Sequence, residues 1–144
     1  MQVQHKLQQL DALLRESKLK EADAFLTEQI QAAEQEPDWE AALTLYNEQM
    51  GFLRDCGRFA ESITAGERAL QCIQTLHLEQ TIPHATTLLN VANAQRAAGD
   101  YEAAFSSYQA VKALYDCLLP PTDGRVASYY NNLSLLYQAV EDWE

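Results

Sequence analysis

The sequence predicts an all-α fold in which about seven helices form a solenoid of stacked helical hairpins. One observation is compositional: Ala, Leu, Gln and Glu, which favour helices, dominate the 144 residues, and runs rich in Val, Ile and Thr are absent. The other is a repeat, because 42 residues separate Gly57 from Gly99 and Gly99 from Glu141. An aromatic column follows two residues later at each step: Phe59, Tyr101 and Trp143.

Residues 1–37 are predicted to form a degenerate first repeat that caps the stack. Ala22 and Leu26 occupy the small and apolar positions that the later units also fill. Ser17, however, stands where the later units have a glycine between their two helices. The weaker match indicates a capping unit rather than a standard one.

Residues 38–80 are predicted to form the first complete unit. Its first helix carries Tyr46, Met50 and Leu53 at i, i+4 and i+7, the spacing of one buried helical stripe. Gly57 follows, where a glycine can adopt the left-handed conformation that ends a helix. The small residue Ser62 then allows the second helix to approach the first closely.

Residues 81–121 are predicted to form the second complete unit. Pro83, shortly after Thr81, marks the start of its first helix, and Gly99 marks the end. Asp100 stands at the N-cap position of the second helix. The buried stripe of that second helix consists of Ala104, Tyr108, Val111 and Tyr115.

Residues 122–144 are predicted to form the first helix of a further unit and the opening residues of its second helix. Without a partner helix, this segment would expose an apolar surface made of Leu133, Leu136, Tyr137 and Trp143. We therefore expect the 144 residues to be a fragment of a longer repeat protein. The alternative is a native chain that covers this open helix face in a homodimer or by helix exchange.

These columns resemble the tetratricopeptide repeat (TPR). The segment "LLNVANAQRAAGDYEAAFSSYQAV" carries the family's glycine, its small residue and its two aromatic positions. The 42-residue period and "YYNNLSLLYQAVEDW" are similar to the long-pitch variant of kinesin light chains and of many bacterial repeat proteins. The resemblance covers about residues 40–144, and it implies a right-handed superhelix whose concave groove binds a protein or peptide segment.

Asparagines are the candidate binding residues, because Asn disfavours helix interiors yet recurs on the predicted first helices. They are Asn47, Asn90, Asn93, Asn131 and Asn132. The resemblance implies that the Asn90 and Asn132 column hydrogen-bonds the backbone of an extended peptide. Arg54 and Arg96, one per unit, are placed to meet an acidic side chain or a C-terminal carboxylate.

The alternative interpretation assigns these residues to the protein itself. In that case the asparagines bridge neighbouring first helices, and the arginines are solvated or pair with carboxylates on the surface. These carboxylates are Glu48, Asp55 and Glu61.

Other functions find little support. The net charge of −11 disfavours nucleic acid, and neither a membrane-spanning segment nor a signal peptide is recognisable, which predicts a cytoplasmic protein. Three widely spaced cysteines and three isolated histidines match no metal site or catalytic triad, and no glycine-rich phosphate loop occurs. We therefore expect neither an enzyme nor a cofactor.

Two functional hypotheses remain. In the first, the concave groove makes the chain a protein- or peptide-binding scaffold. In the second, the repeats are an accessory or regulatory domain of a larger enzyme or peptide-sensing regulator whose effector domain lies beyond residue 144.

Overall fold

The computed structural model describes residues 1–143, with side chains described as far as Glu141. Within that range the chain forms seven α-helices and no strand, which confirms the predicted all-α solenoid. The helices are α1 (Val3–Arg15), α2 (Leu19–Gln35), α3 (Trp39–Asp55), α4 (Phe59–Thr75), α5 (Ile82–Ala98), α6 (Tyr101–Leu118) and α7 (Gly124–Trp143).

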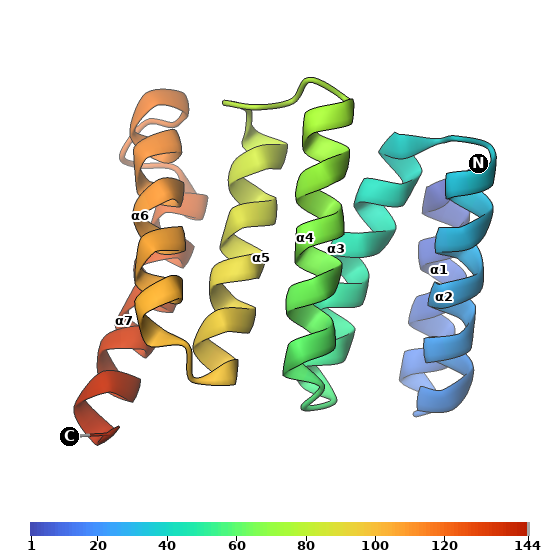
Figure 1. Ribbon diagram of the computed structural model, residues 1–144, viewed down its shortest axis with the longest axis horizontal. Coiled ribbons are helices and arrows are strands. Elements are labelled where there is room, and N and C mark those ends of the chain that lie inside the picture. Colours follow the sequence, from blue (N-terminus) through green and yellow to red (C-terminus); the bar gives the residue numbers. More distant parts are fainter. Residues whose placement is uncertain (144) are drawn as a thin grey trace.

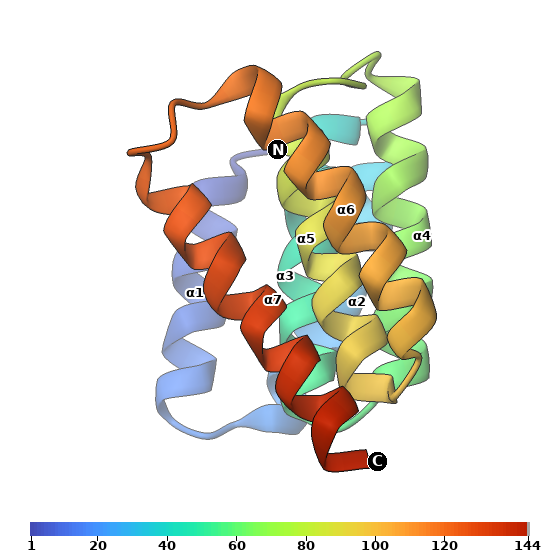
Figure 2. The same ribbon diagram turned by 90° about the vertical axis from the view of Figure 1, so that its left-hand side faces the viewer.

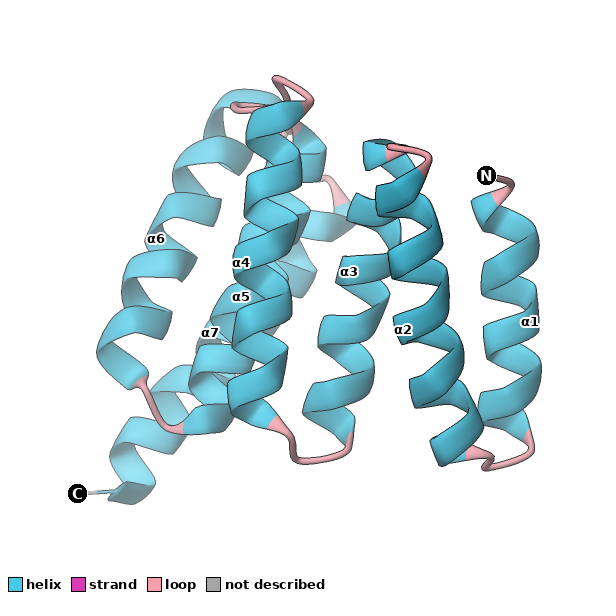
Figure 3. Ribbon diagram, turned by 45° about the vertical axis from the view of Figure 1, so that its right-hand side comes forward, coloured by secondary structure: helices cyan, strands magenta, loops and turns pink. Residues whose placement is uncertain are grey.

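Consecutive helices run antiparallel and stack in chain order along the long axis of the molecule (Figure 1). Short loops join them, as the colouring of Figure 3 shows. Helices α1, α3, α5 and α7 are the first helices of their hairpins, and each contacts the next one in this row. By contrast, α2 and α4 make no backbone contact among the described residues. In Figure 2, α1 and α7 lie to the same side of α3 and α5, so the row of first helices is curved.

The predicted helix ends are confirmed. Gly57 and Gly99 both have positive φ angles, 76° and 84°, and each follows a first helix. Asp100 caps α6, where its side chain accepts a hydrogen bond from the Ala103 amide. Ser17 adopts the same left-handed conformation, with φ of 57°, although it has a side chain.

The core follows the predicted stripes. Tyr46, Met50 and Leu53 of α3 are all buried, and so are the stripe residues of α6. Ser62 and Ala104 are both fully buried, which confirms that small residues lie where the paired helices meet. The Ser62 hydroxyl also donates a 2.8 Å hydrogen bond to the Met50 carbonyl oxygen, so this buried polar group is satisfied.

The prediction for α7 was partly wrong. Leu136 is 1% exposed, because α7 turns it into the core that α5 and α6 form, and Leu133 packs against the same core. Tyr137 is exposed as expected, at 54%, and Tyr130 is exposed beside it at 48%. The ring of Phe105 lies 6.4 Å from that of Tyr137. Trp143 was also predicted to form part of this exposed surface, but its side chain lies outside the described ones.

Candidate functional site

A groove runs across the first-helix face of α1, α3 and α5. It consists of two cavities of about 520 and 440 Å³, which meet at Asn47 and Glu48 in the middle of α3. One cavity extends from this point toward α5, and the other extends toward α1. We call the two together the first-helix groove.

The cavity toward α5 lies beside the N-terminal half of α3 and the loop that enters α5. Its lining, besides the two shared residues, is Glu40, Leu43, Thr44, Leu78, Ile82, Pro83 and Thr86. The loop residues come here because Thr81 caps α5, with its hydroxyl accepting from the His84 amide, and Pro83 lies in the first turn. The apolar part of this wall comes from Leu43, Leu78, Ile82 and Pro83, and the hydroxyl groups come from Thr44 and Thr86.

The cavity toward α1 lies beside the C-terminal half of α3. Its lining, besides the shared residues, is Leu10, Leu14, Leu19, Gly51, Phe52, Asp55 and Cys56. Leu14 and Leu19 are 36% and 52% exposed, although both are large and apolar. A Cβ atom added at Gly51 would meet no atom within 4 Å, so this glycine leaves the groove open.

The groove is acidic. Glu40, Glu48 and Asp55 line it, and no lysine or arginine is among the lining residues. Glu48 stands at the centre and its side chain is exposed to solvent. The groove walls still remove enough of its water to raise the pKa of its carboxyl, and the nearby charge of Asp11 raises it further. A cation bound there would offset both effects.

Asn47 and Asn90 form a bridge between α3 and α5. The side-chain amide of Asn90 donates a 2.8 Å hydrogen bond to the Asn47 carbonyl oxygen. The Asn47 amide in turn donates to the Thr87 hydroxyl at 3.2 Å and to the Leu43 carbonyl oxygen at 3.1 Å. These bonds match the alternative interpretation, in which asparagines join neighbouring first helices. Asn47 nevertheless also lines both cavities of the groove.

Asn93 and Arg96 are engaged inside the α5–α6 hairpin. Asn93 is only 8% exposed, and its carbonyl oxygen accepts a 2.6 Å hydrogen bond from the Tyr108 hydroxyl. The Arg96 Nε donates to the same hydroxyl at 3.1 Å. Burial and the Arg96 charge act on Tyr108 in opposite directions, and burial dominates, so its pKa is raised. The structure thus places Asn93 in the packing between helices and not on the open face.

The remaining predicted residues lie outside the groove lining. Asn132 donates a 2.9 Å hydrogen bond to the Ser128 carbonyl oxygen one turn earlier in α7, and Asn131 is exposed. Arg54 is half-buried, with its Nε 3.9 Å from the Asp55 carboxylate. Of the seven candidate residues, Asn47 alone lines the described groove.

The apolar lining was missed by sequence reasoning. The 100° helical period does place Thr44, Glu48, Gly51 and Asp55 on the face of the first helix opposite its buried stripe, and all four line the groove. Leu19, Leu78 and Ile82 were not identified, because they come from the ends of helices joined by loops whose path the period does not determine. The available signal was a large apolar residue directly beside a turn, at Leu19 and at Ile82.

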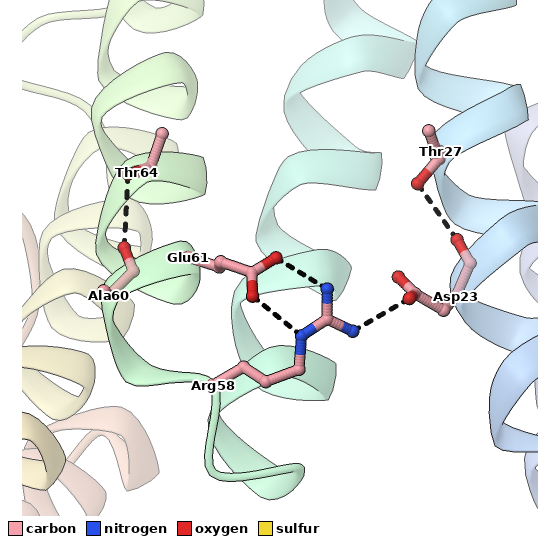
Figure 4. A network of polar contacts seen from close by, with 6 residues as sticks. All are labelled: Asp23, Thr27, Arg58, Ala60, Glu61 and Thr64. Atoms are coloured by element: carbon pink, nitrogen blue, oxygen red, sulfur yellow. Dashed lines mark hydrogen bonds and ion pairs between the residues drawn. The ribbon is translucent and has the colours of Figure 1, made fainter.

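A second hollow, of about 530 Å³, lies between α2 and α4 on the opposite face. Figure 4 shows the polar contacts beside it. Arg58 spans the two helices, with its guanidinium 2.8 Å from the Asp23 carboxylate and 2.6 Å from that of Glu61. Deeper in, the Tyr46 hydroxyl donates a short hydrogen bond to the Glu34 carboxylate. The Arg58–Asp23 ion pair thus links α2 to the start of α4, two helices whose backbones make no contact.

In the described part of the chain, no group of three or more His, Cys, Asp or Glu is placed to hold a metal ion. None of the described helices combines the length and the apolar character needed to span a bilayer.

Comparisons with known proteins agree on the fold. The family model described as "Tetratricopeptide repeat" matches residues 42–116, which is more than half of the chain. A crystal structure of BtubC (BKLC) from P. vanneervenii is similar, with a TM-score of 0.80 and 24% identity over 92% of this chain. The chain spans 53% of the length of that protein. No match was found among curated proteins. The chain belongs to the tetratricopeptide repeat family, whose repeats generally act as protein-interaction scaffolds.

Proposed function

We propose that this chain is a non-catalytic binding module that holds an extended peptide segment of a partner protein in the first-helix groove. One observation carries the proposal: two cavities join across α3 into a single groove, and large apolar side chains are exposed at one end of it. Monomeric proteins seldom expose such side chains together unless another molecule covers them.

Gly51 presents no side chain to the groove and so leaves space there for a peptide backbone. Glycine weakens the interior of a helix by about 0.5–1 kcal/mol relative to alanine, so its place in the middle of α3 is unfavourable for folding alone. Its value for binding is the space it leaves. The Cβ atom of a side chain at this position would meet no protein atom within 4 Å, and the longer leucine side chain would extend into the groove.

Peptides selected from a random display library on the immobilised chain would test the proposal. The selected peptides are then titrated against Gly51→Leu and against Ala110→Leu, which places the same side chain at an exposed position of α6 away from the groove. We expect Gly51→Leu to weaken binding by about tenfold or more, the loss of a few buried contacts, and Ala110→Leu to leave it unchanged. Equal binding by both variants would contradict the proposal.

We extend the proposal to Asn90 of α5 and Asn132 of α7, which lie on the same row of first helices as the groove. A side-chain amide has two donor hydrogens and one acceptor oxygen, so Asn90 retains hydrogen-bonding capacity after its bond to Asn47. The double variant Asn90→Ala/Asn132→Ala should bind the selected peptides more weakly. Unchanged affinity would restrict the site to the two cavities.

A second candidate function is that of an accessory or regulatory domain within a larger protein. The observation that favours it is the exposed aromatic surface of Phe105, Tyr130 and Tyr137, where a further helix could pack. If a covering element belongs to the same polypeptide, the full coding sequence will continue into it. If two copies of this chain cover the surface instead, light scattering will show a concentration-dependent dimer that Tyr137→Lys abolishes.

A further inference from the structure

Each end of the first-helix groove combines an apolar wall with one carboxylate, Glu40 toward α5 and Asp55 toward α1, and Glu48 stands at the centre. Leu43 forms part of the apolar wall at one end, and Phe52 forms part of it at the other. Between them stands Glu48, which both cavities share. A ligand that fills the groove therefore needs two apolar groups with a group complementary to a carboxylate between them.

The spacing of those groups follows from helix geometry. Leu43 and Phe52 are nine residues apart in α3, which corresponds to about 13.5 Å along the helix axis at about 1.5 Å per residue. They lie on opposite sides of α3, so this is the axial part of their separation, and the apolar side chains of a ligand must also reach sideways into the two cavities. An extended chain covers about 13 Å in four residues, at about 3.3 Å each. Side chains at i, i+2 and i+4 of an extended peptide also point to the same side. The middle position of such a peptide would thus face Glu48.

The charge at the centre of the groove has no neutralising partner in the part of the chain whose side chains are described. No ion pair of Glu40 or Glu48 occurs among the residues that the structure describes. Asp55, at the α1 end, has only Arg54 at 3.9 Å. The net charge of −11 adds a long-range attraction for cationic ligands. Both the local and the overall electrostatics oppose an acidic peptide here.

We propose that the groove selects extended peptide segments in which a lysine or arginine lies midway between two large apolar side chains, in the order apolar-x-cation-x-apolar. The proposal rests on the proposed function, because it specifies the chemistry of the same site. The apolar side chains occupy the two cavities, and the cation pairs with Glu48. An acidic residue at the middle position is repelled, which gives the module its selectivity.

Three synthetic peptides test this preference, each with the sequence acetyl-Gly-Leu-Ser-X-Ser-Leu-Gly-amide, where X is lysine, norleucine or glutamate. Norleucine keeps the aliphatic stem of lysine without its charge. Titration of the isotope-labelled chain, followed by amide chemical shifts, measures affinities into the millimolar range. We expect the lysine peptide to bind about three- to tenfold more tightly than the norleucine peptide, the range for a partly exposed ion pair, and the glutamate peptide to bind most weakly.

Variants of the central carboxylate assign the preference to its position. Glu48→Gln should reduce the affinity for the lysine peptide to that of the norleucine peptide, and Glu48→Lys should make the glutamate peptide the preferred one. Glu67→Gln, an equal change of net charge at an exposed position of α4, is the matched control and should leave the order unchanged. Both glutamates are exposed, so these variants should fold.

The outcomes separate the two proposals. Equal binding of the lysine and norleucine peptides, both weakened by Gly51→Leu, would overturn the cation preference and keep the groove as the peptide site. A lysine preference that Glu67→Gln removes as fully as Glu48→Gln would also overturn it, because net charge alone would then explain the selection. Binding unaffected by Gly51→Leu, or no shift with any peptide, would overturn the proposed function itself.

Discussion

Two helical glycines should respond in opposite directions to the same substitution. In the middle of a helix, glycine is about 1 kcal/mol less favourable than alanine, so replacement by alanine normally stabilises. Gly51 has open space around it, and Gly51→Ala should therefore raise the free energy of unfolding by about 0.5–1 kcal/mol. Gly66 is different, because it lies where α4 packs closely against α5.

A Cβ atom at Gly66 would lie 2.7 Å from the Val91 Cγ2 and 3.0 Å from the Met50 sulfur. Methionine is flexible and can yield, but Val91 is β-branched, 6% exposed and held in the core. Forcing an extra methyl group into such a core costs about 1–3 kcal/mol. After the gain in helix propensity, Gly66→Ala should be destabilised by about 0–2 kcal/mol, and it should be about 1–3 kcal/mol less stable than Gly51→Ala.

Urea and thermal unfolding followed by circular dichroism measure this difference. An unfolding entropy of about 2.1 cal/mol/K per residue gives about 0.3 kcal/mol/K for this chain, so the two variants should differ in Tm by about 3–10 °C. Adding Val91→Ala to Gly66→Ala makes room for the methyl group, and the double variant should lose less stability than the sum of the single losses. Equal stability of Gly66→Ala and Gly51→Ala would refute the close approach of α4 and α5.

Three further predictions concern the buried hydroxyl, the thiols and an N-terminal cap. Tyr108→Phe removes the donor to Asn93 and should lower the free energy of unfolding by about 1–3 kcal/mol, whereas an effect below about 0.5 kcal/mol in urea titrations would contradict the buried bond. Burial raises the pKa of the Cys72 thiol to about 11. At pH 8 a disulfide reagent should therefore modify the two exposed cysteines of the native protein and react with Cys72 only after unfolding. Rapid reaction of all three thiols would contradict the burial of Cys72. Asp123 directly precedes α7 and accepts hydrogen bonds from the Arg125 amide and side chain, which lower the pKa of its carboxyl to about 2. The stabilising contribution of this N-terminal cap of α7 should therefore be present above the ordinary carboxyl pKa of 3.8 and disappear as the pH falls toward 2. A carboxyl titration by NMR with a midpoint near 3.8 would disprove this cap.

The sequence alone determined the repeat and the ends of its helices. Gly57, Gly99 and Asp100 act within a few residues of themselves, through backbone conformations and caps that any helical chain obeys. The buried stripes were equally predictable, since a period of 3.6 residues decides which side chains share a face. Local chemistry and periodicity were sufficient for these features.

The tertiary structure alone decided which residues of different units meet. Asn47 and Asn90 are 43 positions apart, and their hydrogen bond depends on how closely α3 and α5 approach, which the packing of many side chains sets. The same holds for Leu136, which the packing of α7 against α5 and α6 buries in their shared core. The groove has this origin too: its apolar ends come from residues beside two loops, and only the stacking of hairpins brings them to opposite sides of Glu48.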